Sequence, residues 1–171
     1  MSTFTIACGP RPLRIDRRPL IMGIVNITPD SFSDGGRFYS TEKAIAHGLQ
    51  LVDEGADILD IGGESTRPFS DPVTEAEEKQ RILPVIENLA KRVSVPISID
   101  TTKAAVARQA VDAGATIIND ISALRMDPQM AATAAQCRVP LILMHMLGTP
   151  KNMQVDPVYD DLIPDIITFL L

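Results

Sequence analysis

The chain contains no tryptophan, and aromatic residues make up only 4% of its 171 residues. Stacking on the bases of a nucleic acid is therefore not expected. The net charge of −6 also argues against a nucleic acid or an anionic membrane as the main partner. The two cysteines, Cys8 and Cys137, lack the spacing of a CxxC or zinc site, and two thiols alone do not indicate a secreted disulfide scaffold.

Long apolar runs are also lacking, since none approaches the ~20 residues of a membrane-spanning helix. Residues 1–20 do not show the basic-then-apolar pattern of a signal peptide. These features predict a cytoplasmic protein with neither a membrane nor a nucleic acid as partner. With 45% apolar and 22% charged residues, the composition is that of an ordinary globular protein, and we expect residues 1–171 to form a single domain.

Short apolar runs alternate with amphipathic segments along most of the chain. The core strands are expected at 20–26, 57–61, 95–100, 116–120 and 140–145. Residues 1–19 precede them as a hairpin or extension, in which 3–8 would pair with 12–16 around a Gly9-Pro10 turn. Because each core strand is followed by a helical segment, the pattern predicts an α/β fold of parallel strands with helical crossovers.

The helices carry recognisable start and stop signals. Their expected starts are Ser40 or Thr41, Thr74 with Glu77 as a capping box, Thr102, Asp127-Pro128 and a point near Asp160. Gly55 and Gly114 are expected to end the first and third helices. Pro84 is expected to kink the second helix or divide it.

Polar residues gather where the predicted strands end, namely Asn26, the 64–67 loop, Asp100, Asn119 and His145. Functional residues occupy this carboxyl edge both in a (β/α)8 barrel and at the switch point of an open doubly wound sheet. The chain lacks GxGxxG and GxxxxGKS/T sequences, the two commonest nucleotide-binding loops of open sheets, so a barrel is favoured. A barrel typically takes ~250 residues, so five units imply either an incomplete barrel or an open sheet.

The stretch at 21–36, IMGIVNITPDSFSDGG, is the most distinctive in the chain. It begins as a buried strand and continues as a loop with two carboxylates, an amide and several hydroxyls. Such a loop can hold a metal or an oxyanion. From these residues alone, an ordinary strand-to-helix loop with Asx turns is an equally good interpretation.

This stretch resembles the first signature of the dihydropteroate synthase family, and DILDIGGESTRP at 57–68 resembles the second. SIDTTK, IINDIS and LMHMLGTP, at 98–103, 117–122 and 143–150, follow in the order found in that family. The resemblance runs from about residue 20 to the end. It implies a pterin-binding (β/α)8 TIM barrel, truncated after about five βα units.

The resemblance also implies an activity and a site. The family condenses 6-hydroxymethyl-7,8-dihydropterin diphosphate with p-aminobenzoate, giving 7,8-dihydropteroate and diphosphate in folate biosynthesis. It assigns catalytic roles to Arg67 and Asp34, magnesium binding to Asn26, and substrate contacts to the set Thr66, Asp100, Asn119, Phe32 and Pro68. Two of these residues have structural alternatives, since Asp100 could cap the following helix and Asn119 could be a hydrogen-bonded core amide.

Two other functions remain open at this point. One is a pterin-dependent methyl-transfer module, which shares the barrel and a similar Asp/Asn pair but has no diphosphate to hold. The other is a non-catalytic pterin-binding fragment, because the basic groups that the family carries in its later units have no counterpart in this sequence. On that account we expect the 171-residue chain alone to be inactive. A homodimer is one assembly that a complete protein could form.

Overall fold

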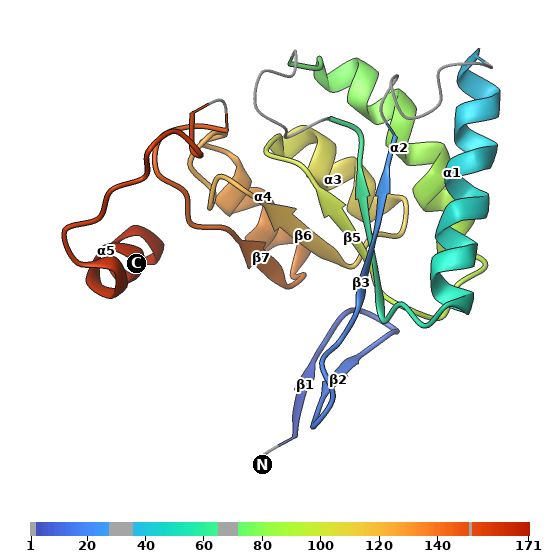
Figure 1. Cartoon of the computed structure of the whole chain (residues 1–171). Coiled ribbons are helices and arrows are strands. Elements are labelled where there is room, and N and C mark those ends of the chain that lie inside the picture. The colour runs from blue at the N-terminus through green and yellow to red at the C-terminus, as the bar shows by residue number, and fades with distance from the viewer. Residues whose placement is uncertain (1–2, 28–35, 65–71, 151) are drawn as a thin grey trace.

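The computed structural model describes residues 3–27, 36–64, 72–150 and 152–171, and for 36–40 the backbone only. Five βα units follow one another along the chain (Figure 1). They are β3 (Met22–Asn26) with α1 (Gly36–Asp53), β4 (Ile58–Gly62) with α2 (Glu75–Ala90), β5 (Ile97–Asp100) with α3 (Ala104–Asp112), β6 (Ile117–Asp120) with α4 (Met130–Cys137), and β7 (Leu141–Leu143) with α5 (Leu162–Leu170).

The five core strands pair in parallel and in chain order, β3-β4-β5-β6-β7. Helices α1, α2, α3 and α4 each pack on the next, so they form a single layer, and α5 lies outside that layer in Figure 1. A strand order that follows the chain, with consecutive helices in one layer, is the arrangement of a barrel rather than of a doubly wound sheet. The predicted α/β class and the first five units of a TIM barrel are therefore confirmed.

The core lies between this helix layer and one face of the sheet. In α2, Ile82, Val85, Ile86 and Leu89 are fully buried, as are the strand residues that alternate toward the helices. On β3, Val25 is 0% exposed whereas its neighbour Ile24 is 53% exposed. Because side chains alternate along a strand, these two values separate a helix-covered face from the opposite, uncovered face.

The amino-terminal hairpin lies below the sheet in Figure 1, at the amino ends of the strands. β1 (Phe4–Ile6) pairs antiparallel with β2 (Leu13–Ile15), as predicted. Cys8 and Leu13 pack with Ile58 and Ile117 in a second small core. Burial raises the pKa of the Cys8 thiol, against a smaller opposing effect of a backbone hydrogen bond at Leu13. The hairpin therefore covers the end of the sheet opposite the carboxyl edge.

Several predicted helix starts are wrong. Helix α1 begins at Gly36, so Ser40 and Thr41 lie within it, where a hydroxyl residue is tolerated although it is not favoured. Helix α3 is preceded by Lys103 and not by Thr102, and the Ala104 N–H donates to Asp127 Oδ2 at 2.8 Å. Its first free N–H is thus bound by a carboxylate from another unit of the fold.

Helix α4 also differs from its prediction, and of the two outcomes predicted for Pro84 in α2, a kink or a division, the division is excluded. Helix α4 begins at Met130 because Asp127 and Pro128 form a preceding turn, in which Asp127 Oδ1 accepts from the Gln129 N–H at 2.9 Å. Helix α2 continues through Pro84 without a division.

The remaining helix signals are confirmed. Thr74 caps α2 by accepting from the Glu77 N–H at 3.3 Å. Gly55 and Gly114 follow α1 and α3 with φ angles of 103° and 119°, which favour glycine. Among the described residues, no helix is long and apolar enough to cross a membrane.

Candidate functional site

Residues at the carboxyl ends of four strands form one row. The register pairs Asn26 of β3 with Gly62 of β4, Gly62 with Asp100 of β5, and Asp100 with Asn119 of β6. Neighbours in a register row of a parallel sheet present their side chains on the same face. The sheet therefore brings together three of the predicted site residues, Asn26, Asp100 and Asn119.

Gly62 leaves space at the centre of this row. A Cβ atom built on Gly62 would lie 3.2 Å from Asn26 Oδ1 and 3.6 Å from Asp100 Oδ2. Both oxygen atoms thus lean toward the space that the missing side chain leaves. A side chain at position 62 would compete for that space with a ligand held between the amide and the carboxylate.

Asp60 is a site residue that the sequence interpretation missed. It lies two residues before Gly62, so its side chain points to the same face, and it is only 4% exposed. Asn119 Nδ2 donates to Asp60 Oδ2 at 3.2 Å, which joins β6 to β4 across the intervening β5. A carboxylate inside the otherwise apolar strand ILDIG was the available signal, because buried aspartates are rare unless they have a specific partner.

Burial raises the pKa values of both carboxyl groups of this face, Asp100 and Asp60. Burial raises the pKa of Asp100 to about 7, and the nearby charges of Asp60, Glu78, Asp120 and Glu64 contribute in the same direction. Burial also raises the pKa of Asp60, whereas its interactions with Ser98 and Asn119 lower it. Asp100 is therefore poised to change charge near neutral pH.

Three buried polar atoms of this face make no hydrogen bond of normal geometry in the described part of the chain: Asp100 Oδ1, Asp60 Oδ1 and Ser98 Oγ. Ser98 is the register partner of Asp60 and lies close enough to lower its pKa, so Asp100 Oδ1 is the atom most in need of a partner. Buried polar groups are normally hydrogen-bonded, so unpaired atoms gathered at one place indicate that a ligand supplies their partners. Carboxylate oxygens of this kind suit a ligand that offers N–H donors.

The structural alternative for Asp100 is not supported. The residue that precedes α3 is Lys103 and not Asp100, and the Lys103 side chain makes no capping hydrogen bond. The Ala104 N–H at the start of the helix is instead bound by Asp127. The alternative for Asn119 holds in part, because its amide has the bond to Asp60. Asp100 Oδ1 thus makes no structural hydrogen bond within the described residues.

The loop after β6 is held by Asp120, the residue next to Asn119. Asp120 Oδ1 accepts from the Ser122 N–H at 2.8 Å and from Ser122 Oγ at 2.7 Å, and its Oδ2 accepts from the Leu124 N–H at 3.0 Å. Ala123 and Leu124 have φ angles of 51° and 66°, which are costly for residues other than glycine. These bonds hold a strained turn beside the site.

His145 packs against two aromatic rings, as expected for a residue with a structural role. Its ring lies 4.6 Å from that of Phe169 and 5.7 Å from that of Tyr159. The Arg125 guanidinium lies 3.8 Å from the centre of the Phe169 ring and donates to the Phe169 carbonyl. These contacts attach the end of α5 to the loop after β6.

The other predicted site residues, Phe32, Asp34, Thr66, Arg67 and Pro68, lie outside the described residues. Asn26 is the one predicted metal ligand within them, and it is exposed at the end of β3. Over the ranges that the structure describes, no group of three or more His, Cys, Asp or Glu residues could by itself hold a metal ion.

The sequence is similar to those of known dihydropteroate synthases. The sequence is 49% identical over 169 residues to the dihydropteroate synthase of Bacillus subtilis (strain 168), covering 99% of this chain and 57% of the relative. It is 46% identical over 153 residues to that of Escherichia coli (strain K12), covering 90% of this chain and 54% of the relative. The chain thus spans about half the length of these relatives.

Solved structures give the same result. Xanthomonas albilineans dihydropteroate synthase with 4-aminobenzoic acid matches with a TM-score of 0.88 and 50% identity, over 99% of this chain and 59% of that one. The same enzyme in complex with 7,8-dihydropteroate matches with a TM-score of 0.82 and 48% identity, over 97% and 57%. The sequence profile described as "pterin binding enzyme" matches residues 22–171, and the chain therefore belongs to the family of pterin-binding enzymes.

Proposed function

We propose that this chain carries the pterin-binding part of a dihydropteroate synthase. In the proposed reaction, the amine nitrogen of p-aminobenzoate attacks the methylene carbon of 6-hydroxymethyl-7,8-dihydropterin diphosphate. A C–N bond forms as the C–O bond breaks, diphosphate leaves with the electron pair, and the amine loses a proton. The products are 7,8-dihydropteroate and diphosphate.

The unpaired buried oxygens beside Asn119 are the observation that carries this proposal. Asp100 Oδ1 and Asp60 Oδ1 are acceptors without a partner among the described residues, and the Asn119 amide, next to Asp100 in the register, donates to the other oxygen of Asp60. A pterin is a flat heterocycle with adjacent N–H donors and acceptors along one edge. Two carboxylates and an amide, fixed on three neighbouring strands, are suited to bind such an edge.

The diphosphate leaving group would bind at the Asn26 side of the row. Asn26 Oδ1 faces the space above Gly62, and an amide oxygen fits Mg²⁺, which keeps several waters and takes its other ligands from phosphate oxygens. We propose Asn26 as a magnesium ligand, with Asp34 as a second loop ligand. When bound, the ion would neutralise charge that develops on the departing diphosphate. Arg67 and Thr66 are proposed as further contacts to the diphosphate, and Phe32 and Pro68 as walls of the p-aminobenzoate pocket.

The proposal is tested by calorimetry on the chain with two ligands, a bare pterin and the dihydropterin diphosphate, each with and without Mg²⁺. We expect both ligands to bind, and only the diphosphate to bind more tightly with Mg²⁺. Asp100→Asn should weaken both, whereas Asp53→Asn, a matched change at an exposed position of α1, should weaken neither.

The possible results separate the candidate functions. Pterin binding that does not respond to diphosphate or Mg²⁺ would favour the methyl-transfer module. A complete protein that contains this chain and binds the diphosphate without turnover to dihydropteroate would favour a non-catalytic pterin-binding protein. Binding of neither ligand would refute the proposal. A cytoplasmic location and a homodimer remain predictions.

A further inference from the structure

The hydrogen bond between Asn119 and Asp60 has a consequence for the ligands that the site can accept. Asn119 Nδ2 donates to Asp60 Oδ2 at 3.2 Å. An ionised carboxylate can only accept hydrogen bonds, so the amide must turn its nitrogen toward Asp60. The amide oxygen occupies the other corner of the planar group. Asn119 therefore presents its acceptor, Oδ1, on the side away from Asp60.

The shape of the Asn119 side chain does not by itself impose this orientation. The two ends of an amide have nearly the same size, and Asn119 is only partly buried. A half-turn of the amide would bring Oδ1 against Asp60 Oδ2, and two acceptors would then face each other without a proton between them. The carboxylate of Asp60 thus favours one of the two orientations.

Asp60 is held firmly enough to impose an orientation. It is 4% exposed and lies in the middle of β4, which is paired with β3 on one side and β5 on the other. Burial raises the pKa of Asp60, whereas interactions with Ser98 and Asn119 lower it, as expected of donors that bind the charged form. Because Asn119 belongs to β6, the acceptor and the amide that it orients come from different βα units.

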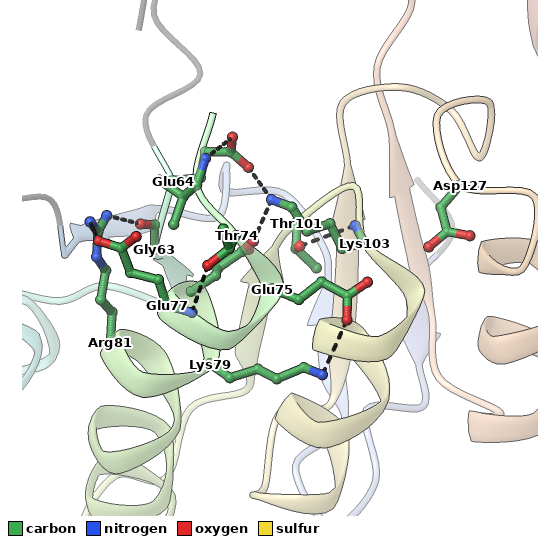
Figure 2. Close-up of polar contacts among 12 residues, drawn as sticks. Gly63, Glu64, Thr74, Glu75, Glu77, Lys79, Arg81, Thr101, Lys103 and Asp127 are labelled. Carbon is green, nitrogen blue, oxygen red and sulfur yellow. Dashed lines mark hydrogen bonds and ion pairs between the residues drawn. The ribbon is translucent and has the colours of Figure 1, made fainter. Parts of the chain in front are cut away.

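Stability does not account for a carboxylate at position 60. The cation at the start of α3 is engaged elsewhere, since Lys103 Nζ donates to Glu64 Oε2 (Figure 2) and to Glu78 Oε2. Within the parts of the chain that the structure describes, Asp60 forms no ion pair. Burying an unpaired carboxylate costs stability. Its bond to Asn119 instead indicates a role in the site.

We infer that Asp60 is a positioning residue, which fixes the Asn119 amide with its oxygen toward the ligand and so selects ligands that offer an N–H donor there. The inference rests on the proposed function and adds its specificity. A pterin, which is a 2-amino-4-oxopteridine, would be preferred over lumazine, its 2,4-dioxo analogue. Lumazine carries a carbonyl in place of the amino group, and that carbonyl would face acceptor oxygens. Sites built from hydrogen-bonding groups reject such a mismatch strongly.

The test compares pterin and lumazine binding by calorimetry in a double-mutant cycle on the full chain. Asp60→Asn keeps the shape of the side chain but offers both a donor and an acceptor, so Asn119 can adopt either orientation. Asp60→Ser is a second variant, which removes the carboxylate without adding an amide. Asn119→Ala supplies the other arm of the cycle. The matched control is Asp53→Asn, at an exposed position of α1.

The expected result is a change in the ratio of the two affinities. Wild type should prefer pterin over lumazine by at least about 100-fold. This ratio should fall about 10-fold in each Asp60 variant and stay unchanged in Asp53→Asn. In the Asn119→Ala background, Asp60→Asn should change the ratio by less than about twofold, because the group through which it acts is absent. The lost charge is common to both backgrounds, so the cycle separates orientation from a general electrostatic effect.

Two further measurements need no ligand. Urea unfolding should show Asp60→Asn to be at least as stable as wild type, because the substitution removes a buried charge. In NMR spectra, the side-chain amide of Asn119 is assigned by its loss in Asn119→Ala. Its protons should exchange with water about 10-fold more slowly in wild type than in Asp60→Ser.

The outcomes keep the inference separate from the proposed function. Equal amide exchange in wild type and Asp60→Ser would refute the hold of Asp60 on Asn119. An unchanged affinity ratio in both Asp60 variants would refute the specificity role. A loss that persists in full in the Asn119→Ala background would also refute it, because Asp60 would then act by direct contact. A wild-type chain that binds neither ligand would refute the proposed function, and amide exchange would still decide whether Asp60 orients Asn119.

Discussion

Replacing Asp100 with asparagine is expected to stabilise the ligand-free chain while weakening pterin binding. Burial and the surrounding carboxylates raise the pKa of Asp100 from 3.8 to about 7. In the folded chain the group therefore holds its proton over a pH range in which the unfolded chain has released it. Stability is consequently lost as the pH rises from about 4 through about 7, and the full penalty remains above that range.

The magnitude follows from the size of the shift. At about 1.4 kcal/mol per pH unit, the rise from 3.8 to about 7 sets an upper bound on the order of 4 kcal/mol above neutral pH. The asparagine amide also needs partners in this site, so we expect a net gain of about 2 kcal/mol near pH 8. Near pH 5 the gain should be small, because much of the penalty has not yet developed.

Urea unfolding of wild type and Asp100→Asn near pH 5 and near pH 8 measures this difference. Asp53→Asn serves as the control, because it makes the same chemical change at an exposed position. If Asp100→Asn had the stability of wild type at both pH values, the carboxyl group would be well hydrated and the reasoning would be refuted.

The same variant should bind a pterin less tightly. The amide replaces one of the two acceptor oxygens by a donor, which we expect to cost about 2 kcal/mol, or on the order of 30-fold in affinity. Wild-type affinity should rise with pH through about 7 as Asp100 ionises, whereas that of the variant should not. Calorimetry at several pH values measures both effects, and unchanged affinity would show that Asp100 does not contact the pterin.

Three further predictions follow. Asn26→Ala and Asp34→Ala should each weaken magnesium-dependent binding of diphosphate but not of bare pterin, and an equal calorimetric loss for both ligands would argue against a metal site. Gly63→Ala should destabilise the fold by about 1–3 kcal/mol in urea, because its Cβ would lie 2.8 Å from Ile82 Cγ2 and α2 would have to shift; an unchanged midpoint would contradict this packing. The 171-residue chain alone should self-associate in sedimentation, because apolar residues such as Leu143 of the edge strand β7 are partly exposed. It should also release no measurable diphosphate, because the basic groups that the family resemblance places near the diphosphate have no counterpart in this sequence. A monomer with turnover would contradict both expectations.

The sequence predicted those features whose signals are local. Alternation of apolar strands and amphipathic helices gave the order of the five βα units, because parallel strands need helical crossovers. The Thr74 cap was found because its partner Glu77 is three residues away. Asn26, Asp100 and Asn119 were found because each is the last or next-to-last residue of a strand, and the register then places them in one row.

What the sequence did not reveal depends on contacts between distant segments. The carboxylate at the start of α3 comes from Asp127, which no signal near Thr102 could indicate. Asp60 lies inside a strand that otherwise reads as apolar core, and its role emerges only when Asn119 reaches it across β5. The roles of Arg67 and Asp34 were predicted from the family resemblance, and they stay predictions because both residues lie outside the described residues.

The row of strand ends also couples ligand binding to folding of the whole sheet. Asp60, Asp100 and Asn119 belong to three βα units, and their relative positions exist only when β4, β5 and β6 are paired in register. A pterin bound to all three would act as a non-covalent cross-link between segments about 60 residues apart in the chain. Its binding energy would then add to the stability of every strand pair that it spans, since a ligand that binds only the folded chain stabilises all that must fold to bind it.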